Sequence, residues 1–187
     1  SRPVVETIFA RNAASADISL IEGVMGFYDG ARGQRIKASS ADIALILEVP
    51  VILVIDVGAM AQSCIAVAKG FIDYCPQARI QGIVLNRGGA YHQRWIVPDL
   101  ERELGVKVIG CPPGDARISM PERHLGLLPA DENPELVQKL DYMADHIEKH
   151  LDLGALRQGK SVLKVSLKNS TEGEVLRKDS AFRLDQN

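Results

Sequence analysis

Cysteine is scarce in this sequence, and the three that occur, Cys64, Cys75 and Cys111, are scattered along 187 residues. An odd number of cysteines without a CxxC pair argues against a disulfide framework and fits a reducing compartment such as the cytoplasm. The four histidines have no cysteine companions, which argues against a structural zinc site. We interpret His146 and His150, at i, i+4 spacing near the end of a polar helix, as solvated surface rather than a metal pair.

Long apolar runs are also missing, and the longest, VPVILVI at residues 49–55, is far too short to cross a bilayer. The opening stretch, SRPVVETIFARNAASAD, does not contain the uninterrupted apolar core of a signal peptide. The formal net charge is −2, with acids and bases interspersed, so the sequence indicates no strongly basic surface for nucleic acid or an anionic membrane. We therefore expect a cytoplasmic protein that binds neither nucleic acid nor a membrane.

Hydrophobic residues make up 46% of the chain and occur in segments that alternate between strand-like and helical spacing. This alternation predicts βαβ units and an α/β fold, a three-layer sandwich with a mostly parallel, doubly wound sheet. The run at 49–56 is a continuous aliphatic stretch, typical of a strand covered on both faces. We expect strands at 17–22, 49–56, 80–86, 106–110 and 162–167, and helices at 4–14, 40–49, 59–74, 92–104 and 132–151.

Three of the predicted strands end on polar side chains, Glu22, Asp56 and Asn86. Ligands of an open parallel sheet bind at the carboxyl ends of its strands, so these residues are candidates for a binding site, although a capping or loop-bracing role fits each one alone equally well. Glu22 leads into the glycine-rich stretch IEGVMGFYDG (21–30), which carries Asp29. Glu22 could hold Mg²⁺ together with substrate phosphates, Asp29 could reach a substrate or a metal, and the glycines would let the backbone approach a ligand closely.

The stretch IEGVMGFYDG resembles the hallmark of the cobyrinic acid a,c-diamide synthase family, which are glutamine-dependent amidotransferases of the corrinoid pathway. Further similar stretches follow in the same order, and the similarity spans about residues 5–155: PVILVID with MAQS, GIVLNR, VIGCPPGD and MPERHLGLLPADEN. The resemblance implies a synthetase domain with the P-loop NTPase-like fold of dethiobiotin synthetase and the MinD-like ATPases. In such a domain ATP phosphorylates a carboxylate of the macrocycle, and ammonia from a second, glutaminase domain attacks the acyl phosphate.

The resemblance also implies roles for single residues. Glu22 falls on the position that helps to hold Mg²⁺ between the nucleotide phosphates, and Asp29 on the acid that handles the c-carboxylate of the corrinoid. Asn86 matches the asparagine that reads the nucleotide base, and Pro113 lies in the loop that packs beside it. These roles suit phosphoryl transfer, because that reaction depends mainly on positioning and charge neutralisation.

Three other side chains, Tyr28, Arg123 and His124, allow either a substrate-binding or a structural interpretation. Tyr28 could contact a flat macrocycle, although an anchor for the loop is the simpler interpretation. Arg123 or His124 could meet a substrate carboxylate or a phosphate, and a buried ion pair or a helix cap explains them equally well. We interpret Cys111 as a buried structural thiol and Trp95 as a packing residue. Ser40 or Asp42 is the expected cap of the helix at 40–49.

Two parts of the family pattern have no counterpart in this sequence: the first strand with its P-loop, and the C-terminal glutaminase domain. We therefore expect residues 1–151 to be a partial ATP-dependent synthetase (amidoligase) domain that lacks its first β-α unit and is inactive alone. Residues 152–187 are polar, and we interpret them as a linker or as the truncated start of a glutaminase domain. An apolar edge left by the missing strand would favour a homodimer.

A literal P-loop pattern does occur, GALRQGKS at 154–161, but it follows a charged helix and leads into a strand-like stretch. Because a working P-loop follows a buried strand and opens a helix, we interpret this match as a coincidence. Three alternatives to the diamide synthase interpretation stay open. They are another P-loop protein (dethiobiotin synthetase-like or MinD/ParA-like), an enzyme for another tetrapyrrole (hydrogenobyrinic acid or nickel sirohydrochlorin), and a non-catalytic remnant or binding module.

Overall fold

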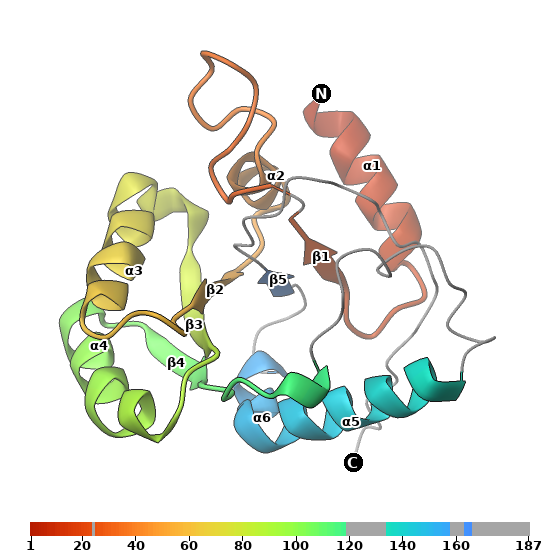
Figure 1. The fold of residues 1–187 in the computed structure, drawn as a ribbon. Helices are drawn as coiled ribbons and strands as arrows, with labels where there is room; N and C mark the ends of the chain where they lie inside the picture. Colours follow the sequence, from red (N-terminus) through yellow and green to blue (C-terminus); the bar gives the residue numbers. More distant parts are fainter. Residues whose placement is uncertain (24, 119–133, 158–162, 166–187) are drawn as a thin grey trace.

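The computed structural model describes residues 1–23, 25–118, 134–157 and 163–165 (Figure 1). Each segment predicted to be a helix or a strand contains one, with bounds that differ by a few residues from the expected ones. The elements are α1 (Arg2–Ala13), β1 (Leu20–Glu22), α2 (Ser40–Leu47), β2 (Val51–Asp56), α3 (Ser63–Tyr74), β3 (Ile80–Asn86), the π-helix η2 (His92–Ile96), α4 (Val97–Leu104), β4 (Lys107–Gly110), the 3₁₀ helix η3 (Ala116–Ile118), α5 (Pro134–His150), α6 (Leu153–Arg157) and β5 (Leu163–Val165), with a further 3₁₀ helix, η1 (Pro76–Ala78), before β3.

All strand pairs of the described residues are parallel, which confirms the predicted α/β class. The strands form two sheets: β2, β3 and β4 lie side by side in that order, and β1 pairs with β5. Figure 1 shows β5 between β1 and β2, with α3 and α4 on the far side of the three-stranded sheet. β5 comes from the segment that was interpreted as a linker. The sheet that carries Glu22 is therefore formed by two segments distant in sequence, and Glu22 is paired with Val165.

The main core lies between the three-stranded sheet and the helices α3 and α4. Alternate residues of β2, namely Val51, Leu53 and Ile55, are only 1–3% exposed. The intervening Ile52 and Val54 are half-buried, so the second face of β2 is covered less completely than the first. This core comprises Leu53, Ile55, Val57, Cys64, Ile65, Ala68, Ile83, Leu85, Ile96, Val97, Leu100 and Cys111.

A second cluster joins α2 to the start of β2 and to the loop that follows β1. Its buried members are Phe27, Ala41, Ala44, Val49, Val51, Cys75 and Ala78. The residue that caps α2 is Ser39, whose hydroxyl accepts a hydrogen bond from the Asp42 amide at 3.2 Å. The predicted caps, Ser40 and Asp42, were therefore wrong by position, because the helix begins one residue after Ser39; Asp42 instead accepts a hydrogen bond from the Ala38 amide at 2.7 Å.

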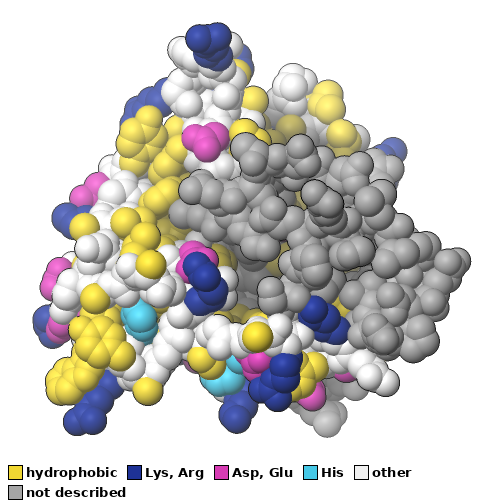
Figure 2. All heavy atoms as spheres, in the orientation of Figure 1, with side chains coloured by type: hydrophobic (Ala, Val, Ile, Leu, Met, Phe, Trp, Pro, Cys, Tyr) yellow, Lys and Arg dark blue, Asp and Glu magenta, His cyan; other side chains and the backbone are white. Residues whose placement is uncertain are grey.

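The surface of the described residues is of mixed charge. On the face in Figure 2, acidic and basic side chains are interspersed among hydrophobic and neutral ones, in keeping with the net charge of −2. In the part of the chain that the structure describes, no helix is long and apolar enough to cross a bilayer.

Candidate functional site

The polar ends of β2 and β3 lie side by side, as the sequence predicted for strands of one parallel sheet. Asp56 is the direct partner of Asn86 in the strand register, and the amide of Val57 donates to the Asn86 carbonyl at 2.9 Å. Glu22 ends β1, which belongs to the other sheet. The structure thus brings Asp56 and Asn86 together, whereas it puts Glu22 on a separate sheet.

Asp56 is held by Arg87, a residue that the sequence reasoning missed. The Arg87 Nε lies 2.8 Å from both carboxylate oxygens of Asp56, and Nη2 lies 2.8 Å from Oδ2. The amide of Gly58 donates to Asp56 Oδ1 at 3.0 Å, and a Cβ on Gly58 would lie 3.1 Å from the guanidinium carbon. Arg87 has φ +57°, a left-handed conformation that is uncommon for a residue with a side chain.

The turn after β3 packs against the loop after β4. Gly88 forms a parallel bridge with Pro113, and a Cβ on Gly88 would lie 2.3 Å from the Cys111 sulfur. The loop that holds Pro113 is therefore next to the turn that follows Asn86. Cys111 is buried, and burial raises the pKa of its thiol, which confirms the prediction of a buried structural cysteine.

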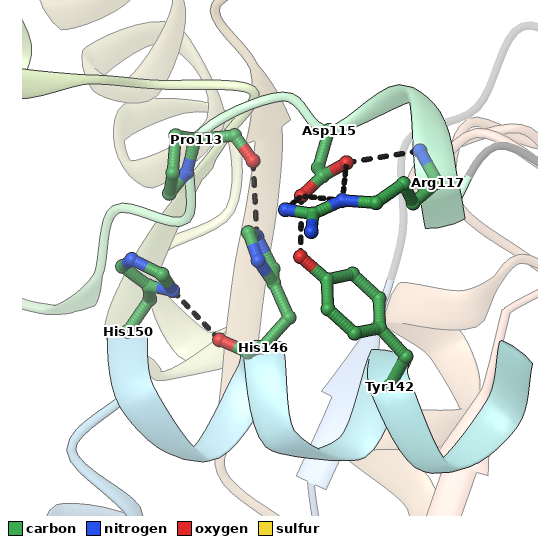
Figure 3. A network of polar contacts seen from close by, with 6 residues as sticks. All are labelled: Pro113, Asp115, Arg117, Tyr142, His146 and His150. Carbon is green, nitrogen blue, oxygen red and sulfur yellow. Dashed lines mark hydrogen bonds and ion pairs between the residues drawn. The ribbon is translucent and has the colours of Figure 1, made fainter. Parts of the chain in front are cut away.

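The same loop is fastened from its other side by α5 (Figure 3). His146 Nε2 lies 3.0 Å from the Pro113 carbonyl oxygen and donates to it, and the Tyr142 hydroxyl donates to an Asp115 carboxylate oxygen at 2.7 Å. Arg117 pairs with the same carboxylate at 2.6 Å, and its guanidinium stacks on the Tyr142 ring at 4.3 Å. The hydrogen bonds that Asp115 accepts hold its pKa well below its usual range. The largest effect comes from the Arg117 side chain, and the Arg117 amide and the Tyr142 hydroxyl add to it.

The prediction that His146 and His150 are solvated surface was wrong for His146, whose residue is only 8% exposed. His150 is partly buried, and its Nδ1 lies 2.7 Å from the His146 carbonyl oxygen. Because residues at i, i+4 spacing share one helix face, both rings lie on the side of α5 that faces the Pro113 loop. The amide of Cys111 donates to the His150 carbonyl at 3.3 Å, and Leu151 bridges to Gly110.

The glycine-rich loop after β1 carries its two acids on the surface. Both Glu22 and Asp29 are exposed. Asp29 closes a turn onto Gly26, with its amide 2.9 Å from the Gly26 carbonyl, and a Cβ on Gly26 would lie 2.2 Å from Asp29 Oδ2. In this structure Gly26 therefore makes room for the carboxylate of Asp29 itself, and Gly30 similarly packs against the Lys37 carbonyl.

Tyr28 anchors this loop to α3. Its hydroxyl donates to the Phe71 carbonyl at 2.5 Å, and its ring stacks on Phe71 at 5.6 Å and tilts against Tyr74 at 4.7 Å. Burial raises the pKa of Tyr28 to about 12. These contacts favour the loop-anchor reading of Tyr28. The other two weak substrate-binding candidates, Arg123 and His124, lie outside the described residues.

The structure also describes Trp95 and the first half of the P-loop-like stretch. Trp95 is 54% exposed, with the Arg94 guanidinium 4.8 Å from its ring centre, so the prediction that it is a packing residue was wrong. It belongs to η2, and Figure 2 shows hydrophobic side chains at the surface over this end of the molecule. The first half of the P-loop-like pattern, 154–157, is itself helical in α6, which supports the interpretation that the match is a coincidence; 158–161 lie outside the described residues.

A metal site made of protein side chains alone is absent from the described residues: no group of three or more His, Cys, Asp or Glu side chains is arranged to hold a metal ion. A single exposed carboxylate such as Glu22 still suits Mg²⁺, because this ion commonly takes one or two carboxylates and completes its shell with phosphates and water. Asn86 ends β3, and the Pro113 loop is bridged to the turn that follows it, so both lie at the same edge of the sheet.

No protein-family model and no solved structure matches the chain. Among curated proteins, it is 41% identical over 153 residues to the cobyrinate a,c-diamide synthase of Caldanaerobacter subterraneus subsp. tengcongensis, a match that covers 81% of this chain and 34% of that protein. It is 37% identical over 150 residues to the hydrogenobyrinate a,c-diamide synthase of Agrobacterium fabrum (80% and 34% covered) and 40% identical over 154 residues to the cobyrinate a,c-diamide synthase of Listeria innocua (82% and 34% covered). The resemblance found in the sequence is confirmed, and the chain spans about a third of the length of the curated relatives it matches.

Proposed function

We propose that this chain, a relative of the cobyrinate and hydrogenobyrinate a,c-diamide synthases, is the nucleotide- and substrate-facing part of an enzyme that amidates the a and c carboxylates of a corrinoid acid. The observation that carries the proposal is the 37–41% identity to these enzymes over about four fifths of the chain. ATP and glutamine-derived ammonia would be the co-substrates, and the P-loop and glutaminase parts would be supplied by sequence outside these 187 residues.

The base of the nucleotide would lie at the rim where β3 and β4 end. Two observations support this: Asn86 sits at the carboxyl end of the central strand, and the Pro113 loop is bridged to the turn directly after it. Parallel sheets bind ligands at this edge because the loops that follow neighbouring strands converge there. Asn86 would read the base, and Pro113 would form one wall of its site.

Mg²⁺ and the corrinoid would lie on the side of the glycine-rich loop. The exposure of Glu22 and Asp29 supports this, because carboxylates that act on a ligand must be accessible to it. When bound, Mg²⁺-ATP would supply the phosphoryl group that makes a carboxylate reactive towards ammonia. Glu22 would contribute one metal ligand, and Asp29, fixed over Gly26, would orient the carboxylate of the corrinoid.

The proposal is tested by exchanging the matching third of the Listeria innocua cobyrinate a,c-diamide synthase for this chain. We expect the hybrid to convert cobyrinic or hydrogenobyrinic acid to its diamide in the presence of ATP, Mg²⁺ and glutamine, measured by mass spectrometry. Glu22→Gln and Asp29→Asn should each lower the rate by about a hundredfold or more, as losses of charge stabilisation at an active site typically do. Asp73→Asn, which changes another exposed acid on α3, is the matched control and should leave the rate unchanged.

A folded hybrid that makes no diamide from either acid would overturn the proposal. Full activity in both Glu22→Gln and Asp29→Asn would overturn the roles of these two residues. The chain alone should show no Mg²⁺-dependent ATP hydrolysis, since the start of its P-loop-like pattern, 154–157, lies in the helix α6 instead of a loop that follows a strand. Hydrolysis by the purified chain that depends on Asn86 would contradict this expectation.

A further inference from the structure

The loop after β4 contains two consecutive prolines, Pro112 and Pro113, which constrain how it can be held. Proline has no amide hydrogen, so this part of the loop cannot donate backbone hydrogen bonds to a neighbouring strand. The hydrogen bonds that hold it must therefore be accepted by its carbonyl groups or made by its side chains. In the structure α5 supplies one bond of each kind, beside the bridge to Gly88 and the pairing of Arg117 with Asp115 (Figure 3).

The two contacts from α5 are one helical turn apart. His146 donates from Nε2 to the Pro113 carbonyl at 3.0 Å, and Tyr142 donates from its hydroxyl to the Asp115 carboxylate at 2.7 Å. Residues four apart lie on the same face of a regular helix, so both side chains can bind the loop at the same time. The His146 contact is nearly excluded from water, where a buried donor without its acceptor would be costly.

The helix is itself fixed to the sheet that carries the loop. Leu151 bridges to Gly110, and the Asp152 amide donates to the Ile109 carbonyl at 2.7 Å. Lys107 of β4 pairs with the Asp152 carboxylate at 2.6 Å. α5 therefore has a defined position relative to the end of β4. The hydrogen bond from His146 in turn fixes Pro113 relative to α5.

We propose that His146 and Tyr142 are positioning residues that set the wall of the nucleotide-base site opposite Asn86 and thereby determine which base is accepted. This inference rests on the proposed nucleotide site at the rim. Hydrogen bonds to a base depend on distance and angle, so a displaced loop should discriminate less well between adenine and guanine. The overall fold, which is held by the core of the sheet, α3 and α4, does not depend on these two side chains.

The experiment measures base selectivity of the 187-residue chain by titrating it separately with ATP and GTP in the presence of Mg²⁺. Binding is followed by the NMR shifts of the Asn86 and Gly88 amides, which can detect weak binding. We expect the unchanged chain to favour ATP, His146→Ala to lower the ratio of the two affinities by about tenfold, and Tyr142→Phe to lower it by a smaller factor. His146→Gln should retain more selectivity than His146→Ala, because its side-chain amide can donate to the Pro113 carbonyl.

The control is Asn12→Ala, since the Asn12 side-chain amide also donates to a backbone carbonyl, that of Ile8 at 2.7 Å, and lies in α1. Selectivity should be unchanged in Asn12→Ala, and thermal unfolding is measured for every variant. Unchanged selectivity in His146→Ala and in Tyr142→Phe would overturn the inference alone, and so would an equal loss in Asn12→Ala. Absence of any ATP preference in the unchanged chain would overturn the base site of the proposed function and this inference together. If His146→Ala does not fold, Tyr142→Phe, which removes one oxygen atom, decides the outcome.

Discussion

Gly88 occupies a place in the rim where even one added carbon atom has no room. A Cβ at this position would lie 2.3 Å from the Cys111 sulfur and 3.0 Å from the Leu85 carbonyl oxygen. The sulfur belongs to a buried side chain and the oxygen to the backbone of β3, so neither can swing into solvent. Adding a methyl group to a close-packed site costs about 1–3 kcal/mol, and two rigid neighbours indicate the upper half of this range for Gly88→Ala.

The assay is urea unfolding followed by circular dichroism, with Gly89→Ala as the control. Gly89 is adjacent in sequence, yet a Cβ there would meet no atom within 4 Å. Both substitutions reduce the freedom of the unfolded chain to the same extent, so the difference between them isolates the packing term. We expect Gly88→Ala to lower the free energy of unfolding by about 2–3 kcal/mol, and Gly89→Ala to change it by less than about 0.5 kcal/mol.

A double-mutant cycle identifies the sulfur as the cause. Cys111→Ala removes the sulfur atom and by itself should cost about 1 kcal/mol for the lost buried contacts. In its presence, Gly88→Ala should be less harmful by about 1–2 kcal/mol, with the remainder due to the Leu85 carbonyl. Equal stability of Gly88→Ala and Gly89→Ala, or a coupling energy near zero, would refute the packing described for these two loops.

Three further predictions concern other parts of the molecule. Gly70→Ala, in the interior of α3 where a Cβ meets no atom within 4 Å, should stabilise the protein by about 0.5–1 kcal/mol in the same urea assay, and a loss of stability would contradict the open space seen there. Burial raises the pKa of the Cys64 and Cys111 thiols, so both should resist iodoacetamide at mildly alkaline pH until the protein is unfolded. Their raised pKa also means that the unfolded chain loses its thiol protons first, so the free energy of unfolding should decline as the pH rises above 9.0; rapid alkylation of either thiol in the native protein would contradict its burial. The lowered pKa of Asp115 stabilises the fold fully above the ordinary value of 3.8, and this contribution is lost progressively as the pH falls from 3.8 through the lowered pKa. Asp115→Asn should therefore be less stable than the unchanged chain at pH 7, and the difference should shrink as the pH falls below 3.8; a deficit of the same size at both pH values would show that the charge is not responsible.

The elements that the sequence predicted well are those with local signals. β3 was expected at 80–86 and is Ile80–Asn86, because a run of aliphatic residues between turn-forming residues specifies a buried strand without knowledge of its neighbours. The polar ends of β2 and β3 followed from the same pattern, and the convergence of Asp56 with Asn86 follows from parallel pairing. The family resemblance likewise depends on the order of short motifs along the chain, which is why the comparisons confirm it.

Other features depend on contacts between residues far apart in the chain. Nothing in the pattern around His146 indicates that Pro113 will accept its hydrogen bond, and a polar helix with two histidines looks the same whether it faces water or a loop. Arg87 pairs with Asp56 from a left-handed backbone conformation directly after β3, and the residue pair Asn86–Arg87 gives no indication of that conformation. The exposure of Trp95 depends on how η2 turns the chain before α4.

The α/β class, the main strands and helices, and the similarity to the a,c-diamide synthases all follow from periodicity and motif order, which are properties of neighbouring residues along the chain. Three other features appear only in the folded chain: β1 pairs with β5 rather than with β2, Gly26 makes room for Asp29, and α5 holds the Pro113 loop. These arrangements arise where backbone and side chains from distant segments compete for the same space and the same hydrogen bonds. That competition is resolved only when the chain has packed.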